Sequence, residues 1–137
     1  LARRGGGLVH VVNVHQAAER AVREIASCGA VLTTSLHGLI TADAFGIPAV
    51  WTTLDPALNG GDFKFRDYET VVTPGRTRFA PIDEESSLDS VIRSARRADA
   101  ETITVIVRGL EESLAHLADE LGTLAPFPIG VEPVVRM

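Results

Sequence analysis

Apolar residues gather along the first part of the chain in short blocks that predict β-strands. Residues 8–14 are rich in β-branched side chains and follow three glycines, which is typical of a buried strand. Residues 30–34 and 49–52 have the same apolar, partly β-branched character. We therefore expect three short strands in this part of the chain.

The segments between these blocks carry apolar residues at helical spacing. Residues 16–28 predict a helix with one apolar face, and Gly29 follows as a stop. Residues 36–45 are apolar nearly all round, which predicts a buried helix that ends at Gly46 and Pro48. Parallel strands need a crossover, and a helix is the usual one. The pattern thus predicts an α/β fold with a Rossmann-like parallel sheet flanked by helices.

The second half of the chain has a less regular pattern. Residues 62–68 alternate phenylalanine with charged residues, as an extended strip would, but Asp62 and Arg66 are also spaced to pair across one helical turn. Both interpretations stay open. Residues 88–98 and 101–121 predict helices that cover the sheet or an absent partner domain.

The length of 137 residues suits one domain. We divide the chain into a flexible start at 1–7, a Rossmann-like domain at 8–121 and an extended, proline-containing tail at 122–137. The sequence begins without methionine, and we interpret it as a fragment or a trimmed part of a longer protein.

Composition and charge narrow the choice of partners. The net charge of −5 argues against nucleic acid, because affinity for a phosphate backbone comes largely from lysine and arginine. The single cysteine, Cys28, permits no intrachain disulfide, which fits a reducing cytoplasm. No apolar run reaches the roughly 18 residues that a membrane span needs. We therefore expect neither nucleic acid nor a membrane span.

The histidines near the start of the chain do not predict a metal site. His10 and His15 lack the one-turn spacing of a helical zinc motif, and no third ligand is evident. We expect no metal and no bound cofactor.

The segment between the second predicted strand and the next helix is the best candidate for ligand binding. Open α/β sheets bind ligands outside the carboxyl ends of their strands, where free helix N–H groups and the helix dipole favour an anion. With Ser35 as N-cap, the imidazole of His37 falls in the first helical turn and can reach the same anion. Gly38 lacks a side chain, so a ligand can approach the backbone closely. We expect a phosphate or carboxylate here.

The same segment resembles a known protein family. Residues 34–40, Thr-Ser-Leu-His-Gly-Leu-Ile, and residues 42–48, Ala-Asp-Ala-Phe-Gly-Ile-Pro, are similar to the S-x-x-H-G…A-x-G-x-P signature of polysaccharide pyruvyltransferases. Residues 60–68 resemble a segment of the bacterial exopolysaccharide members, which form pyruvate ketals. As a motif match, the resemblance is a hypothesis that structural context must test.

The resemblance implies two Rossmann-like halves arranged as in a two-domain glycosyltransferase-B-like fold, with this chain as the carboxy-terminal, donor-site half. Members of the family transfer the enolpyruvyl unit of phosphoenolpyruvate onto two hydroxyls of a sugar, giving a cyclic ketal. The implied partners are phosphoenolpyruvate, a saccharide acceptor that a lipid carrier can hold, and the missing amino-terminal half-domain. The implied location is the cytoplasm, including the inner face of the membrane, and a homo-oligomer stays open.

The resemblance also assigns roles within the motif. His37 matches the family histidine that contacts phosphoenolpyruvate, which implies a catalytic role. The substrate-binding residues implied beside it are Thr34, Ser35, Leu36 and Gly38. Many members carry arginine directly before the Leu-His pair, where this chain has Ser35.

We expect Lys64 or Arg66 to supply the positive charge that Ser35 lacks, because both side chain types bind phosphate. The alternative is a solvated strip in which these cations pair with Asp62 or Asp67.

Two other functions stay open at this point. A glycosyltransferase-like half-domain would bind a nucleotide sugar at the same helix start, since the fold alone does not select the donor. A non-catalytic remnant would use its exposed cleft face only to associate with another chain.

Overall fold

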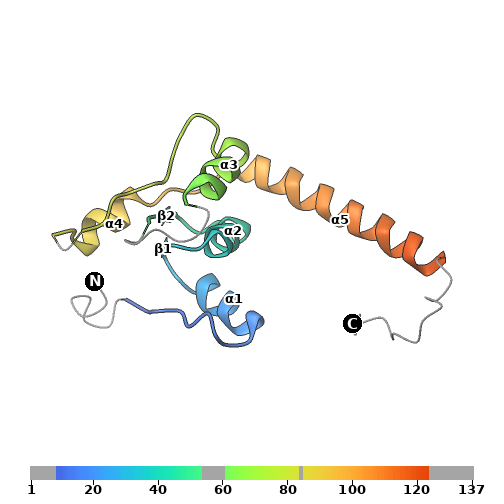
Figure 1. Cartoon of the computed structure of the whole chain (residues 1–137), viewed down its shortest axis with the longest axis horizontal. Coiled ribbons are helices and arrows are strands. Elements are labelled where there is room, and N and C mark those ends of the chain that lie inside the picture. Colours follow the sequence, from blue (N-terminus) through green and yellow to red (C-terminus); the bar gives the residue numbers. More distant parts are fainter. Residues whose placement is uncertain (1–8, 54–60, 84, 124–137) are drawn as a thin grey trace. The chain divides into compact units, whose positions relative to one another are not determined.

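The computed structural model describes residues 9–53, 61–83 and 85–123 (Figure 1). The predicted flexible start at 1–7 and the tail beyond residue 123 lie outside these ranges. In chain order the elements are α1 (Ala18–Ala26), β1 (Val31–Thr33), α2 (Leu36–Ala44), β2 (Ala49–Trp51), α3 (Phe63–Val72), α4 (Leu88–Ser94) and α5 (Ala100–Thr123). The chain forms two compact units, one that ends at Thr104 and a second that begins at Val105.

The sheet of the first unit consists of β1 and β2, which pair in parallel with Val31 opposite Ala49 and Thr33 opposite Trp51. Helix α2 connects the two strands and packs against both of them (Figure 1). The predicted α/β class is therefore confirmed as a β-α-β unit. This two-stranded sheet is smaller than the Rossmann-like sheet that the sequence predicts.

The strand predicted at 8–14 is wrong over its described part. Residues 9–13 have no regular secondary structure, and Val14 lies in a turn. Val11 and Val14 are each 71% exposed, so these β-branched side chains do not enter a core. A strand also needs hydrogen bonds to a neighbour, and no strand in the described ranges pairs with this segment. The apolar composition of this segment was therefore not sufficient to predict a strand.

Two isolated bridges continue the pairing on the other side of β2. Phe79 bridges Trp51 in parallel, and Arg96 bridges Ala49 in antiparallel orientation. The N–H of Ala80 donates to the carbonyl of Trp51 at 3.0 Å. After α3, the chain therefore re-enters the sheet beside β2 in the position that a third parallel strand would occupy.

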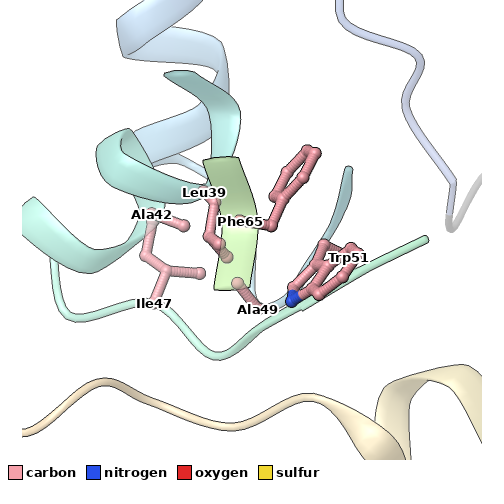
Figure 2. Close-up of a cluster of buried hydrophobic side chains, with 6 residues drawn as sticks. All are labelled: Leu39, Ala42, Ile47, Ala49, Trp51 and Phe65. Atoms are coloured by element: carbon pink, nitrogen blue, oxygen red, sulfur yellow. The ribbon is translucent and has the colours of Figure 1, made fainter. Parts of the chain in front are cut away.

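The main core lies between the strands and helices α2 and α3 (Figure 2). Its centre is Trp51, whose ring stacks on Phe65 at a centroid distance of 4.6 Å with 8° between the planes. The other buried members are Leu39, Ala42, Ile47 and Ala49. Val50 points to the opposite face, because successive strand residues alternate, and packs there with Val91 of α4.

Helix α2 forms where the sequence predicts it but is not buried all round. Leu39 and Ala42 are fully buried, whereas Ile40 is 40% and Phe45 is 55% exposed. The helix packs against the sheet and α1, and the part of its surface that carries Ile40 and Phe45 remains in solvent. Gly46 ends the helix with φ of +63°, a conformation that glycine adopts without strain.

Residues 63–68 are helical, so the extended interpretation of segment 62–68 was wrong. Asp62 precedes α3 and pairs with Arg66 across one turn at 2.6 Å. Helix α4 ends at Ser94, short of the predicted residue 98, because the following residues extend to bridge Ala49. Helix α5 contains the predicted residues 101–121 and also includes Ala100, Gly122 and Thr123. The extended tail predicted from residue 122 is therefore wrong for its first two residues, which are helical. No helix in the described ranges is both long and apolar enough to cross a membrane.

Candidate functional site

His37 lies in the first turn of α2, directly after the carboxyl end of β1. Ser35 occupies the N-cap position in extended conformation, with φ of −116° and ψ of 131°, but its hydroxyl makes no capping hydrogen bond. The imidazole of His37 is exposed, whereas the neighbouring residues Thr34, Ser35, Leu36 and Gly38 are half-buried. The five motif residues therefore form one continuous segment at the sheet edge where ligands of α/β proteins bind.

Thr33 holds this turn in place of a serine cap. Its Oγ1 accepts a hydrogen bond from the N–H of Ser35 at 2.9 Å and donates one to the carbonyl of Ser35 at 3.0 Å. A Cβ added to Gly38 would lie 2.5 Å from the same Oγ1. Gly38 is therefore required by the packing of Thr33, which is a different reason from the ligand approach that the sequence suggested.

The start of α2 offers free hydrogen-bond donors. The N–H of Leu39 donates to the carbonyl of Ser35 at 3.2 Å and is the first to find an acceptor within the helix. The preceding N–H groups of Leu36, His37 and Gly38 have none within the described residues, as expected for a first turn. An exposed imidazole beside unpaired N–H groups can bind an anion and exchange a proton with it.

The end of β2 adds aromatic and cationic side chains to this edge of the sheet. The N–H of Thr52 donates to the carbonyl of Thr33 at 3.0 Å, which keeps the two strand ends together. The Arg66 guanidinium lies 5.9 Å from the centroid of the Trp51 ring, and the Lys64 ammonium lies 5.5 Å from that of Phe65. The start of α3 is therefore fixed beside the end of β2.

The two cationic side chains expected to bind the donor, Lys64 and Arg66, differ in what they contact. Arg66 pairs with Asp62, as the alternative interpretation proposed, and both side chains are substantially exposed. Lys64 makes no ion pair within the described ranges. The structure shows no contact between either cation and His37, so their part in donor binding stays a prediction.

A buried ionic network at the other end of α2 was missed by the sequence analysis. The guanidinium of Arg78 donates to the carboxylate of Asp43 at 2.5 and 3.0 Å and to that of Glu69 at 3.1 Å. The hydroxyl of Tyr68 also donates to Asp43, at 3.0 Å. The side chains of Arg78, Asp43 and Glu69 are 1%, 0% and 4% exposed. The network ties α2 to α3 and to the segment that re-enters the sheet.

The environment of this network shifts the pKa values of two members. Burial alone would lower the pKa of Arg78, but the hydrogen bonds and charges of Asp43 and then Glu69 outweigh it and raise the pKa. Burial, followed by the charge of Asp43, raises the pKa of Tyr68 above its ordinary value. Tyr68 therefore stays protonated and donates to Asp43 at neutral pH.

One signal in the sequence pointed to the network. Asp43 is the single charged residue in a helix that otherwise reads as apolar. A carboxylate on a buried helix requires a partner. The identity of that partner was not legible, because Arg78 is 35 positions away along the chain.

The described residues contain no group of three or more histidine, cysteine, aspartate or glutamate side chains placed to hold a metal. His10 instead contacts Glu24, with 3.0 Å between Nε2 and Oε2. This hydrogen bond lowers the pKa of Glu24.

The fold and site together define an α/β protein with an exposed histidine and free N–H groups at a helix start. Comparison with known proteins adds a family. Residues 3–56 match the family described as polysaccharide pyruvyl transferase. This confirms the resemblance predicted from the motif over that part of the chain, which contains β1, α2, β2 and His37.

A curated viral protein also matches. The protein called uncharacterized protein L143 of Acanthamoeba polyphaga mimivirus is 40% identical over 50 residues, which are 36% of this chain and 17% of that protein. The match thus spans about a sixth of the viral protein's length. No solved structure matches the chain significantly.

Proposed function

We propose that this chain is the donor-site half of a transferase that moves the enolpyruvyl group of phosphoenolpyruvate onto a sugar diol, forming a pyruvate ketal in polysaccharide biosynthesis. The observation that carries this proposal is the exposed imidazole of His37 beside unpaired N–H groups at the start of α2, within the residues that match the family. Phosphoenolpyruvate carries phosphate and carboxylate, which suit such a helix start.

In the proposed mechanism, the N–H groups at the start of α2 bind the donor phosphate, and protonated His37 gives its proton to the methylene carbon. The neighbouring carbon becomes oxocarbenium-like, and the first sugar hydroxyl bonds to it while its proton returns to His37. The bond from this carbon to the phosphate oxygen then breaks, and the second hydroxyl takes its place. Its proton leaves with the phosphate, so the products are one ketal and one inorganic phosphate.

We infer that the β1-α2-β2 unit belongs to a Rossmann-like half of a glycosyltransferase-B-like protein. The parallel pairing and the position of Phe79 beside β2 support this arrangement. An amino-terminal half-domain would then supply the opposite wall of the cleft and the site for a saccharide acceptor, which a lipid carrier can hold. Such a reaction would take place in the cytoplasm or at the inner face of the membrane.

The catalytic test compares two histidine substitutions in the full-length protein. His37→Ala should reduce the release of phosphate from phosphoenolpyruvate about 100-fold or more, since a positioned acid typically contributes that much. His15→Ala is the matched control, because His15 is also exposed but lies in the turn before α1. Both variants should keep the melting temperature of the wild type. Activity of His37→Ala within a few-fold of wild type would end the proposal.

Ligand-induced thermal shifts test the donor independently of turnover. Phosphoenolpyruvate at 100 times its Kd should stabilise the wild type by about 2.7 kcal/mol and should not stabilise His37→Ala to the same extent. A shift with a nucleotide sugar and none with phosphoenolpyruvate would favour the glycosyltransferase-like alternative. No shift with either ligand would favour the non-catalytic remnant.

A further inference from the structure

The first unit contains a cavity with a lining rich in arginine. This cavity of about 620 Å³ is lined by the residues after α3 and by those between α4 and the start of α5. Its charged lining residues are Arg76, Arg78, Arg96, Arg97 and Asp99. This accumulation of arginine stands out in a chain whose net charge is −5.

The topology places this cavity at the amino-terminal ends of the strands, whereas His37 lies at their carboxyl ends. The bridge of Phe79 to Trp51 is parallel, so the residues just before it approach the sheet from the amino-terminal end of β2. Arg96 pairs with Ala49, the first residue of β2, and continues in the same direction because that bridge is antiparallel. His37, by contrast, follows the carboxyl end of β1. The cavity is therefore separate from the candidate donor site.

The arginines of the cavity differ in how far their charge is already satisfied. Arg78 is held by Asp43 and Glu69. Within the described ranges, Arg76, Arg96 and Arg97 form no ion pair with a carboxylate. Arg96 donates through Nη1 to the carbonyls of Arg93 and Ala95, which fixes its guanidinium without neutralising it.

Asp99 is the acidic side chain among the described lining residues, and it already has a partner. Its Oδ1 accepts a hydrogen bond from the N–H of Thr102 at 2.8 Å, at the start of α5. The charge of Arg76 also acts on it. Arg96 and Arg97 therefore remain as cations with no acidic counterpart in the described lining.

We propose that this cavity binds a phosphate-bearing metabolite of about the size of a sugar phosphate. Arginine forks bind phosphate oxygens in a planar, two-point geometry. Cavities of roughly 300–1,000 Å³ hold small organic ligands, so 620 Å³ leaves room for an organic group beyond the phosphate. The site does not depend on the proposed pyruvyl transfer.

The test uses isothermal titration calorimetry on the full chain at constant ionic strength, with glucose 1-phosphate and inorganic phosphate as separate probes. The double variant Arg96→Gln/Arg97→Gln should bind glucose 1-phosphate at least tenfold more weakly than wild type. The control Arg93→Gln/Arg108→Gln removes the same charge outside the lining and should bind within twofold of wild type. The variant His37→Ala should also bind within twofold, which separates this site from the donor site.

The two probes identify the form of the ligand. Tighter binding of glucose 1-phosphate than of phosphate supports a sugar-phosphate site, and equal affinities support a site for the phosphate group alone. Arg97→Gln by itself, at an exposed position, should weaken binding at least threefold and serves if the double variant does not fold. Equal affinity of the arginine variants and wild type, or no saturable binding of either probe, would overturn the proposal.

Discussion

Replacing Arg78 by methionine should destabilise the protein strongly, because it leaves two buried carboxylates without their cation. Asp43 and Glu69 are 0% and 4% exposed, and Arg78 supplies hydrogen bonds to both. Removing one partner of a buried pair typically costs about 3–5 kcal/mol, since the remaining charge stays desolvated. A small domain has a free energy of unfolding of roughly 5–15 kcal/mol, so the loss is a large part of the total.

Urea unfolding followed by Trp51 fluorescence measures this loss, because Trp51 is the single tryptophan and is fully buried. Arg23→Met is the matched control, since it breaks the exposed pair with Glu19 and should cost no more than about 1 kcal/mol. A free energy of unfolding for Arg78→Met within 1 kcal/mol of the control would refute the assigned role of the network, on the scale just cited.

Two further predictions concern the ends of helices. Gly38→Ala should lower the free energy of unfolding by about 1–3 kcal/mol, because the added Cβ clashes with Thr33. In the double variant, Thr33→Ala should recover part of this loss; strictly additive effects of the two substitutions in urea unfolding would contradict the packing explanation. The hydrogen bond from Thr102 lowers the pKa of Asp99 below its ordinary value of 3.8. The ionised Asp99 carboxylate therefore stabilises the start of α5 fully above pH 3.8, and this stabilisation is lost as the pH falls through the lowered pKa. The NMR shift of the Thr102 amide should follow this titration, and a midpoint at or above 3.8 would contradict it.

The parts of the fold that the sequence predicted are those governed by local rules. The spacing of apolar residues located α2, and Gly46 marked its end because a positive φ favours glycine. The strands at 30–34 and 49–52 were predicted because short apolar blocks flank a helix of the right length for a crossover. The position of Ser35 before α2 follows from the same local pattern.

The parts that were wrong or missed depend on contacts between distant residues. Residues 8–14 have the composition of a strand, but a strand requires a neighbour that composition does not supply. The partner of Asp43 is Arg78, which the sequence gives no means of choosing among the other arginines. For the same reason, the sequence did not predict the cavity, which forms only when the residues after α3 meet those after α4.

The two ends of α2 are held by different interactions, and this has a consequence for the candidate site. At its start, Thr33 fixes the turn through Ser35 and packs against Gly38. Near its end, Asp43 is clamped by Arg78 in a region with no access to solvent. A helix fixed at both ends cannot tilt freely on the sheet, so the first turn that carries His37 keeps its orientation before any ligand arrives. Preorganised donors are more effective than flexible ones for binding and stabilising charge, which gives the buried network a positioning role in the proposed reaction.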